Sequence, residues 1–262
     1  MKSHVRIVFT ALVVPVLIGF VATASANDFK PGCVIPFQAI EEEHPIDRDC
    51  AIEGAGSGDA HHAQNKAKNN FCATGQPVEV TVSSFLDLQQ AAEDHGIPFG
   101  SSKSLPPDRS VLKNLLQRRG GTTLGEGTKV QLVAFIVDAK NSNVSKGESV
   151  NCKKGGKERN DIHISLAKKP TDALCKTVTA EMSPHLRPAA WDRENLDTLA
   201  HRPVRITGQL FFDASHKPCT AGKKASPARA SNWEIHPVYK IEVFDVPSSR
   251  FISLEDWAAM QH

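Results

Sequence analysis

Histidine and carboxylate residues occur two positions apart in this chain, the spacing that places side chains on one face of a strand. Asp161 and His163 have this spacing, and so do Glu234 and His236. Glu181 belongs to a third stretch of alternating apolar and polar residues. Imidazole and carboxylate groups that meet on one surface can bind a divalent metal or transfer protons. Whether these groups meet depends on how the strands pair.

A metal-dependent hydrolase is one hypothesis for these residues. A hairpin around residues 170–174 would pair positions whose numbers sum to about 344, which makes His163 and Glu181 cross-strand neighbours. His185 lies just beyond the end of the strand that carries Glu181. Two imidazoles and one carboxylate hold a divalent metal and leave coordination positions for a substrate. The predicted metal ligands are therefore His163, Glu181 and His185, and the sequence predicts no cofactor other than such a metal.

Glu234 and His236 are attractive additions to this group, but the expected strand directions separate them from it. In the barrel that the strand pattern predicts, the third and fifth strands run parallel, so their starts lie side by side. His236 is then expected nearer Thr177 than Glu181, on the order of 10 Å from Glu181 at about 3.3 Å per residue. Glu234 and His236 remain candidates for ligand binding on the outer face.

Two lysine-rich loops support another hypothesis, binding of an anionic polymer. Residues 140–160 contain six basic residues and two acidic ones, and residues 214–231 contain four basic residues and no acidic one. Such loops can bind the phosphates of a nucleic acid. Single-strand binding normally also uses aromatic side chains on the sheet, and the second and third strands present none outward. The candidate contacts are Lys153, Lys154, Lys223 and Lys224.

The elements that position these residues follow a clear order in the second half of the chain. Three strands, a helix and two strands are the element order of the OB-fold, a small Greek-key barrel that binds ligands on its outer face. Period-two alternation points the apolar residues inward and the His and carboxylate residues outward. The predicted class is therefore mainly β, with strands at residues 129–138, 160–168, 175–183, 203–213 and 233–245 and a helix at residues 189–201.

The N-terminal half is expected to form an α/β cover on this barrel. Alternation from Val78 to Val82 predicts a strand. Ser84 is expected to cap a first helix, and Asp108 a second helix that ends at Gly120. The first barrel strand is apolar on both faces, so the cover is expected to bury its outer side. The predicted organisation is a signal peptide at residues 1–26, the cover at 27–127 and the barrel domain at 128–262, with a short C-terminal helix capped by Ser253.

The first 26 residues have the pattern of a secretory signal peptide. Lys2 and Arg6 precede the apolar run 7–22, and small residues lead up to a cleavage site after Ala26. The run is too short for a membrane span and contains Pro15, and no later stretch is long and apolar enough for one. The mature protein is therefore expected in the periplasm or outside the cell.

Six cysteines in an exported chain predict disulfides, because that compartment is oxidising. None has C-x-x-C spacing, which argues against a zinc ribbon or a thioredoxin-type redox site. Cys175 and Cys219 are expected at the same end of the barrel and form the preferred pair. Cys152 then pairs with one of the N-terminal cysteines, which ties the cover to the barrel. The full set is Cys33, Cys50, Cys72, Cys152, Cys175 and Cys219.

The net charge and the missing motifs argue against some classes of function but identify none. The chain has 31 Lys and Arg against 29 Asp and Glu, and removal of Lys2 and Arg6 leaves the mature chain without the basic excess typical of nucleic-acid binding. It has no G-x-S-x-G elbow, no phosphate-binding glycine loop and no H-E-x-x-H. These absences favour a binding or interaction module of unknown ligand over an enzyme. An anionic polymer and another envelope protein are the candidate partners, and a purely structural envelope protein is a third hypothesis.

Residues 231–238, which read SNWEIHPV, and residues 160–163, which read NDIH, resemble a group of uncharacterised exported bacterial proteins with an OB-like core. The likeness covers about half of the chain, and W-E-I-H-P is its most specific part. It implies the barrel fold and no activity. The thermonuclease family is also exported and OB-folded, but its D-G-D-T stretch is replaced here by Asp138-Ala139-Lys140-Asn141, which makes that kind of nuclease improbable.

Overall fold

A computed structural model describes residues 44–261, so the expected signal peptide, its cleavage site and Cys33 lie outside the described residues. None of the helices in this range is long and apolar enough to cross a membrane. The helices are α1 (Pro45–Asp49), α2 (Asp59–Lys68), α3 (Val82–Asp94), α4 (Arg193–Asp197) and α5 (Leu254–Ala259). The strands are β1 (Val78–Val80), β2 (Leu116–Gln117), β3 (Thr123–Leu124), β4 (Lys129–Asn141), β5 (Ile162–Ala167), β6 (Val178–Met182), β7 (Pro203–Phe212), β8 (Trp233–Asp245) and β9 (Arg250–Ser253).

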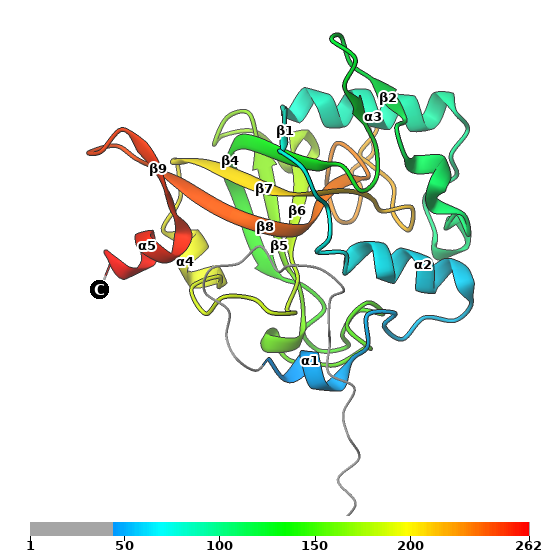
Figure 1. Cartoon of the computed structure of the whole chain (residues 1–262), viewed down its shortest axis with the longest axis horizontal. Coiled ribbons are helices and arrows are strands. Elements are labelled where there is room, and N and C mark those ends of the chain that lie inside the picture. The colour runs from blue at the N-terminus through cyan, green and yellow to red at the C-terminus, as the bar shows by residue number, and fades with distance from the viewer. Residues whose placement is uncertain (1–43, 262) are drawn as a thin grey trace, which may run out of the picture.

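Strands β4 to β8 close into a five-stranded barrel (Figure 1). The sheet order is β4-β5-β6-β8-β7, and β4 also pairs with β7, which closes it. β6 and β8 run parallel, as expected, and the other barrel pairs are antiparallel. Alternate residues of these strands, such as Leu132, Ile164 and Ile206, are fully buried in the core. The prediction of a mainly β, OB-like barrel is confirmed.

The N-terminal segment covers the barrel through one strand and two helices. β1 adds to the sheet in parallel beside β4. α3 starts at a capping box formed by Thr81 and Ser84, so its N-cap is Thr81 and not Ser84 as predicted. Its residues Phe85 and Leu88 are fully buried, and the Leu88 carbonyl accepts a hydrogen bond from the Trp233 indole at 3.0 Å. α2 lies along another side of the barrel (Figure 1).

One predicted helix is absent as an α-helix, another is shorter than predicted, and the cover leaves part of the first barrel strand exposed. The second N-terminal helix is only a 3₁₀ turn, Arg109–Leu112, because Asn114 takes a positive φ of 51° and the chain turns into the β2–β3 hairpin. The helix predicted for residues 189–201 shrinks to α4, one turn that suffices to bury Leu196. Val133 in β4 is 54% exposed, so the outer side of that strand is not covered there.

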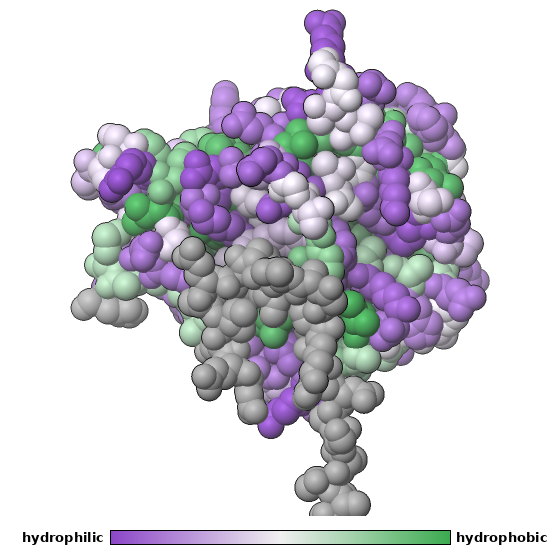
Figure 2. All heavy atoms as spheres, viewed as in Figure 1, coloured by the Kyte–Doolittle hydropathy of each residue, from purple (hydrophilic) through white to green (hydrophobic). Residues whose placement is uncertain are grey.

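The C-terminal helix is confirmed. The Ser253 hydroxyl accepts a hydrogen bond from the backbone N–H of Asp256 at 3.0 Å, which caps α5. Trp257 packs against the barrel and its indole donates to the Thr198 hydroxyl at 2.9 Å. Figure 2 shows that hydrophilic residues are spread over the described part of the face seen in Figure 1, with apolar residues between them in small groups.

The disulfides confirm the predicted connection of the cover to the barrel. Cys175 is bonded to Cys219, and Cys50 to Cys152, each pair with Cα atoms 5.6 Å apart. Cys72 is also disulfide-bonded. Disulfides of this kind are typical of proteins that fold outside the reducing cytoplasm.

Pro237 interrupts the ladder of β8 without ending the strand. Gly208 pairs with Val238 and Leu210 pairs with Ile235, so β8 has an extra residue opposite β7. This is the arrangement of a β-bulge. A Cβ atom added to Gly208 would clash with the Pro237 carbonyl oxygen and the Ile235 side chain.

Gly208→Ala is therefore expected to lower the free energy of unfolding by about 1–3 kcal/mol, because the backbone at the bulge must move. Urea unfolding measures the change. Gly155→Ala is the matched control, since that glycine is exposed and an added Cβ has its nearest neighbour at 3.3 Å. We expect it to cost under about 0.5 kcal/mol. Equal losses in both variants would mean that the bulge is not tightly packed.

Candidate functional site

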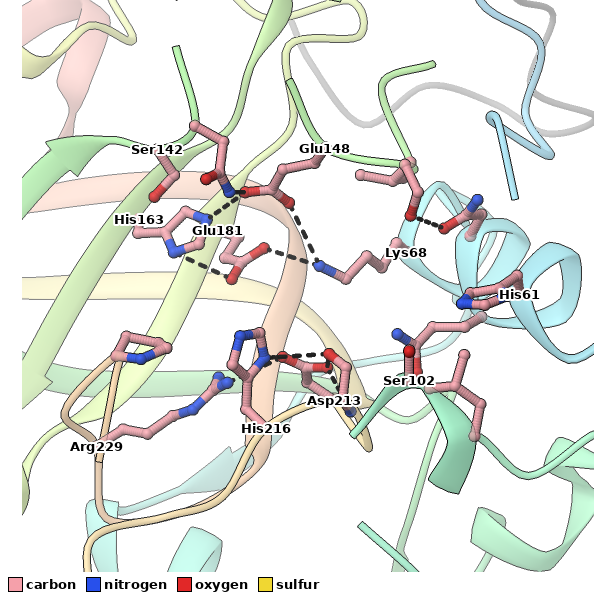
Figure 3. A pocket seen from close by; sticks show the side chains of 18 of the residues that line it. His61, Lys68, Ser102, Ser142, Glu148, His163, Glu181, Asp213, His216 and Arg229 are labelled. Atoms are coloured by element: carbon pink, nitrogen blue, oxygen red, sulfur yellow. Dashed lines mark hydrogen bonds and ion pairs between the residues drawn. The ribbon is translucent and has the colours of Figure 1, made fainter. Parts of the chain in front are cut away.

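A cavity of about 450 Å³ opens on the outer face of the barrel. It lies over β5 and β6, between α2 and the two loops that follow β4 and β7 (Figure 3). These are the two lysine-rich loops that were predicted to bind an anionic polymer. The charged or titratable residues that line the cavity are His61, Lys68, Lys140, Glu148, His163, Glu181, Asp213, His216 and Arg229.

His163 and Glu181 are cross-strand neighbours, as predicted from the numbering of the hairpin. The Nδ1 atom of His163 is 3.4 Å from a carboxylate oxygen of Glu181. Its Nε2 atom is 3.4 Å from a carboxylate oxygen of Glu148. The imidazole therefore lies between two carboxylates (Figure 3).

His236 reaches Glu181, which corrects the predicted separation of about 10 Å. The Nδ1 atom of His236 is 2.7 Å from a carboxylate oxygen of Glu181. The prediction aligned the starts of the two parallel strands, but Thr179 pairs with Glu234, which puts Glu181 level with His236. β6 begins at Val178 rather than at the predicted residue 175, and this shift of three residues accounts for the whole error.

The polar residues predicted to face outward from β6 and β8 do not face solvent. Thr177, Glu181 and Glu234 are at most 1% exposed, and His236 is 0% exposed. The outer face at these strands is therefore a covered polar layer and not an open platform.

Lys68, in helix α2 of the N-terminal cover, also belongs to this polar layer. It was not predicted from the sequence. Its ammonium lies 3.5 Å from a carboxylate oxygen of Glu181 and 3.8 Å from one of Glu148 (Figure 3). Neighbouring residues could not predict that Lys68 and Glu148 join the site, because each lies far along the chain from β6. The Cys50–Cys152 disulfide holds the loop that carries Glu148 against the cover.

Arg229 belongs to the second lysine-rich loop, which was predicted to bind an anionic polymer, yet its side chain is only 1% exposed. It forms an ion pair with Asp213 at 2.9 Å and another with Glu234. Asp213 also lies 2.6 Å from Nδ1 of His216, whose side chain is 41% exposed. Arg229 thus neutralises two buried carboxylates.

Asp161 is buried at the end of this layer without a hydrogen-bond partner. Its side chain is 0% exposed, and neither carboxylate oxygen has a partner among the described residues. Single ligand atoms of Glu148, Asp161, His163 and Glu181 all lie within 4.8 Å of one another. Buried carboxylates are normally hydrogen-bonded, so Asp161 stands out.

The mutual electrostatics of this layer shift several pKa values. Burial, with the nearby charge of Glu148, raises the pKa of Asp161 to about 6. Burial alone would lower the pKa of His163, but the charge of Glu181 and the contacts with Glu148 outweigh it and raise that pKa to about 9. Burial would likewise raise the pKa of Glu181, and the cationic groups around it hold that pKa well below its ordinary value.

The remaining predicted site residues lie elsewhere. Nδ1 of His185 is 2.8 Å from Asp47 of α1, and His185 is not part of the group of four close ligand atoms around His163. The four candidate lysines, Lys153, Lys154, Lys223 and Lys224, are exposed and none lines the cavity.

The geometry thus brings His163, Glu181 and His236 together with Lys68, Glu148, Asp161 and Arg229. No family model matches the chain, and no curated protein or solved structure matches it either.

Proposed function

We propose that this protein is an exported binding module that holds a positively charged ligand in the cavity on the outer face of its barrel. The observation that carries this proposal is the charge balance of the buried polar layer. Among the described residues, four buried carboxylates and one half-buried carboxylate face Lys68, Arg229 and two histidines, His163 and His236, whose pKa values are raised to about 9, so the carboxylates outnumber the cationic groups by one. The carboxylates are Glu148, Asp161, Glu181, Asp213 and Glu234.

This imbalance favours a cation for a physical reason. A buried carboxylate without a partner among the described residues, such as Asp161, is costly, and a bound cation offsets that cost. A concave site with an excess of one charge also focuses its field on the space it encloses. At about 450 Å³, the cavity falls in the size range of small-ligand sites.

The same charge argues against an anionic polymer in the cavity. Phosphates would meet Glu148, Glu181 and Asp213 on its walls. The exposed lysines of the two loops lie outside it. A nucleic-acid strand bound to these lysines would not contact the buried polar layer.

The alternative remains a metal-dependent hydrolase with its His/Glu site on this face. The arrangement of His163 and Glu181 beside an open cavity favours it. It requires the cation to be a metal ion with a coordination position left for water or substrate.

We expect isothermal titration calorimetry to detect one cation site per chain in a panel of spermidine, Mg²⁺, Ca²⁺, Mn²⁺ and Zn²⁺, and none for a thymidine oligonucleotide. Glu181→Gln should weaken binding of the positive probe at least about tenfold, because it removes a buried charge. Glu194→Gln is the matched control, since its side chain is 69% exposed. A chain that binds none of the cations, or binds only the oligonucleotide, would overturn the proposal.

A further inference from the structure

The geometry points to a divalent transition-metal site formed by Glu148, Asp161, His163 and Glu181. This inference rests on the proposed function and names the class of cation. The four residues come from three places in the fold: the loop after β4, the start of β5, and β6. Three of them line the cavity, which provides a path for an ion from solvent.

The ligand atoms are already close to the spacing that a metal requires. They lie within 4.8 Å of one another. In a tetrahedral site with ligands at about 2.0–2.2 Å, the ligand atoms are roughly 3.3–3.6 Å apart. Side-chain rotations that move each ligand atom by up to about 1 Å would therefore suffice, with no change in the pairing of β5 and β6.

Asp161 is an independent indication of a bound ion. Its carboxylate is 0% exposed and has no hydrogen-bond partner among the described residues. A polar group buried in this way costs free energy unless something compensates it. An ion between Asp161 and the other three residues supplies that compensation, whereas a purely structural salt-bridge layer leaves it unexplained.

The donor set selects the kind of metal. Ca²⁺ and Mg²⁺ prefer oxygen ligands alone, and His163 contributes an imidazole nitrogen. Zn²⁺ and Mn²⁺ accept imidazole together with carboxylates. Six-coordinate Mn²⁺ would retain two positions for water or a ligand in the cavity, which connects this site to the hydrolase alternative.

Lys68 gives the site a distinctive test. Its ammonium lies 3.5 Å from Glu181 and 3.8 Å from Glu148, so it competes with an ion for the same two carboxylates. Lys68→Met is expected to raise the affinity for Zn²⁺ by about tenfold, the size of effect that groups around metal ligands have. If the carboxylates served only to pair with Lys68, the same variant would destabilise the fold and bind no ion.

The deciding experiment is titration of the mature chain, stripped with EDTA, with Zn²⁺ and Mn²⁺ in a calorimeter, followed by metal analysis of the dialysed complex. We expect one ion per chain. Asp161→Asn should lower the affinity at least about 100-fold while keeping the melting temperature of the metal-free protein, because this carboxylate has no hydrogen-bond partner among the described residues to lose. Asp87→Asn is the matched control, on the exposed side of α3.

The outcomes separate this inference from the proposed function. Binding of spermidine without binding of Zn²⁺ or Mn²⁺ would overturn the metal site and leave the cation-binding module standing. Absence of all cation binding would overturn both. Zn²⁺ binding that Asp161→Asn leaves unchanged would place the ion elsewhere and also overturn the inference.

Discussion

Arg229→Met is expected to lower the free energy of unfolding by about 3–5 kcal/mol, the loss typical of removing one partner from a buried ion pair. Arg229 is 1% exposed and pairs with both Asp213 and Glu234. Methionine fills much of the same volume, so the loss would come from the two carboxylates left buried beside an apolar side chain. Urea unfolding at pH 7 measures it.

The variant should also change the response to acid. Burial would raise the pKa of Asp213, but the hydrogen bond with His216 and the charge of Arg229 hold it well below its ordinary value. A pKa lowered by folding contributes stability above the unfolded value, which is lost as the pH falls through the folded value. Without Arg229 the pKa of Asp213 rises, so we expect the acid transition to move to higher pH.

Arg205→Met is the control for both measurements. Arg205 pairs with Glu242 at 2.6 Å, but its side chain is 29% exposed at the barrel surface. We expect a smaller loss, because Lys240 still pairs with Glu242 at 2.8 Å and leaves no unpartnered carboxylate. Losses of the same size in the two variants would contradict the importance assigned to the buried network.

Replacing Cys50 and Cys152 together by serine is expected to cost about 4–5 kcal/mol, the value of the chain-entropy model for a loop of roughly 100 residues. The two cysteines are 102 positions apart. The change should also weaken binding of Zn²⁺, because the disulfide holds the loop that carries Glu148. Thermal or urea unfolding gives the first effect and calorimetry the second.

The Cys175–Cys219 bond provides the comparison. It spans 44 positions, for which the same model gives about 4 kcal/mol. Of the four proposed metal ligands this span contains only Glu181, which strand β6 holds in the barrel independently of the disulfide, so the double serine variant should lose similar stability and retain its affinity for Zn²⁺. If both variants lost that affinity equally, the effect would be one of general stability and not of the position of Glu148.

The barrel was predictable because its signals are local. Alternation from Ile162 to Leu166 and from Val204 to Ile206 follows from the period of a strand, and only the neighbouring residues are needed to see it. The His163–Glu181 pair follows from a short hairpin, in which sequence numbers determine the register. The Ser253 cap is equally local. Local preference failed at residues 109–116, where Asn114 turns the chain into a hairpin that packs beside α3.

The sequence by itself determined the strand order, the closed barrel and the Cys175–Cys219 pairing, since each depends on alternation and connection lengths. The tertiary structure alone decided the composition of the site. The register of β6 against β8 brings His236 to Glu181, and α2 brings Lys68 from 113 positions away. Parallel pairing and helix docking join segments with no short connection between them, so their alignment depends on packing over the whole molecule.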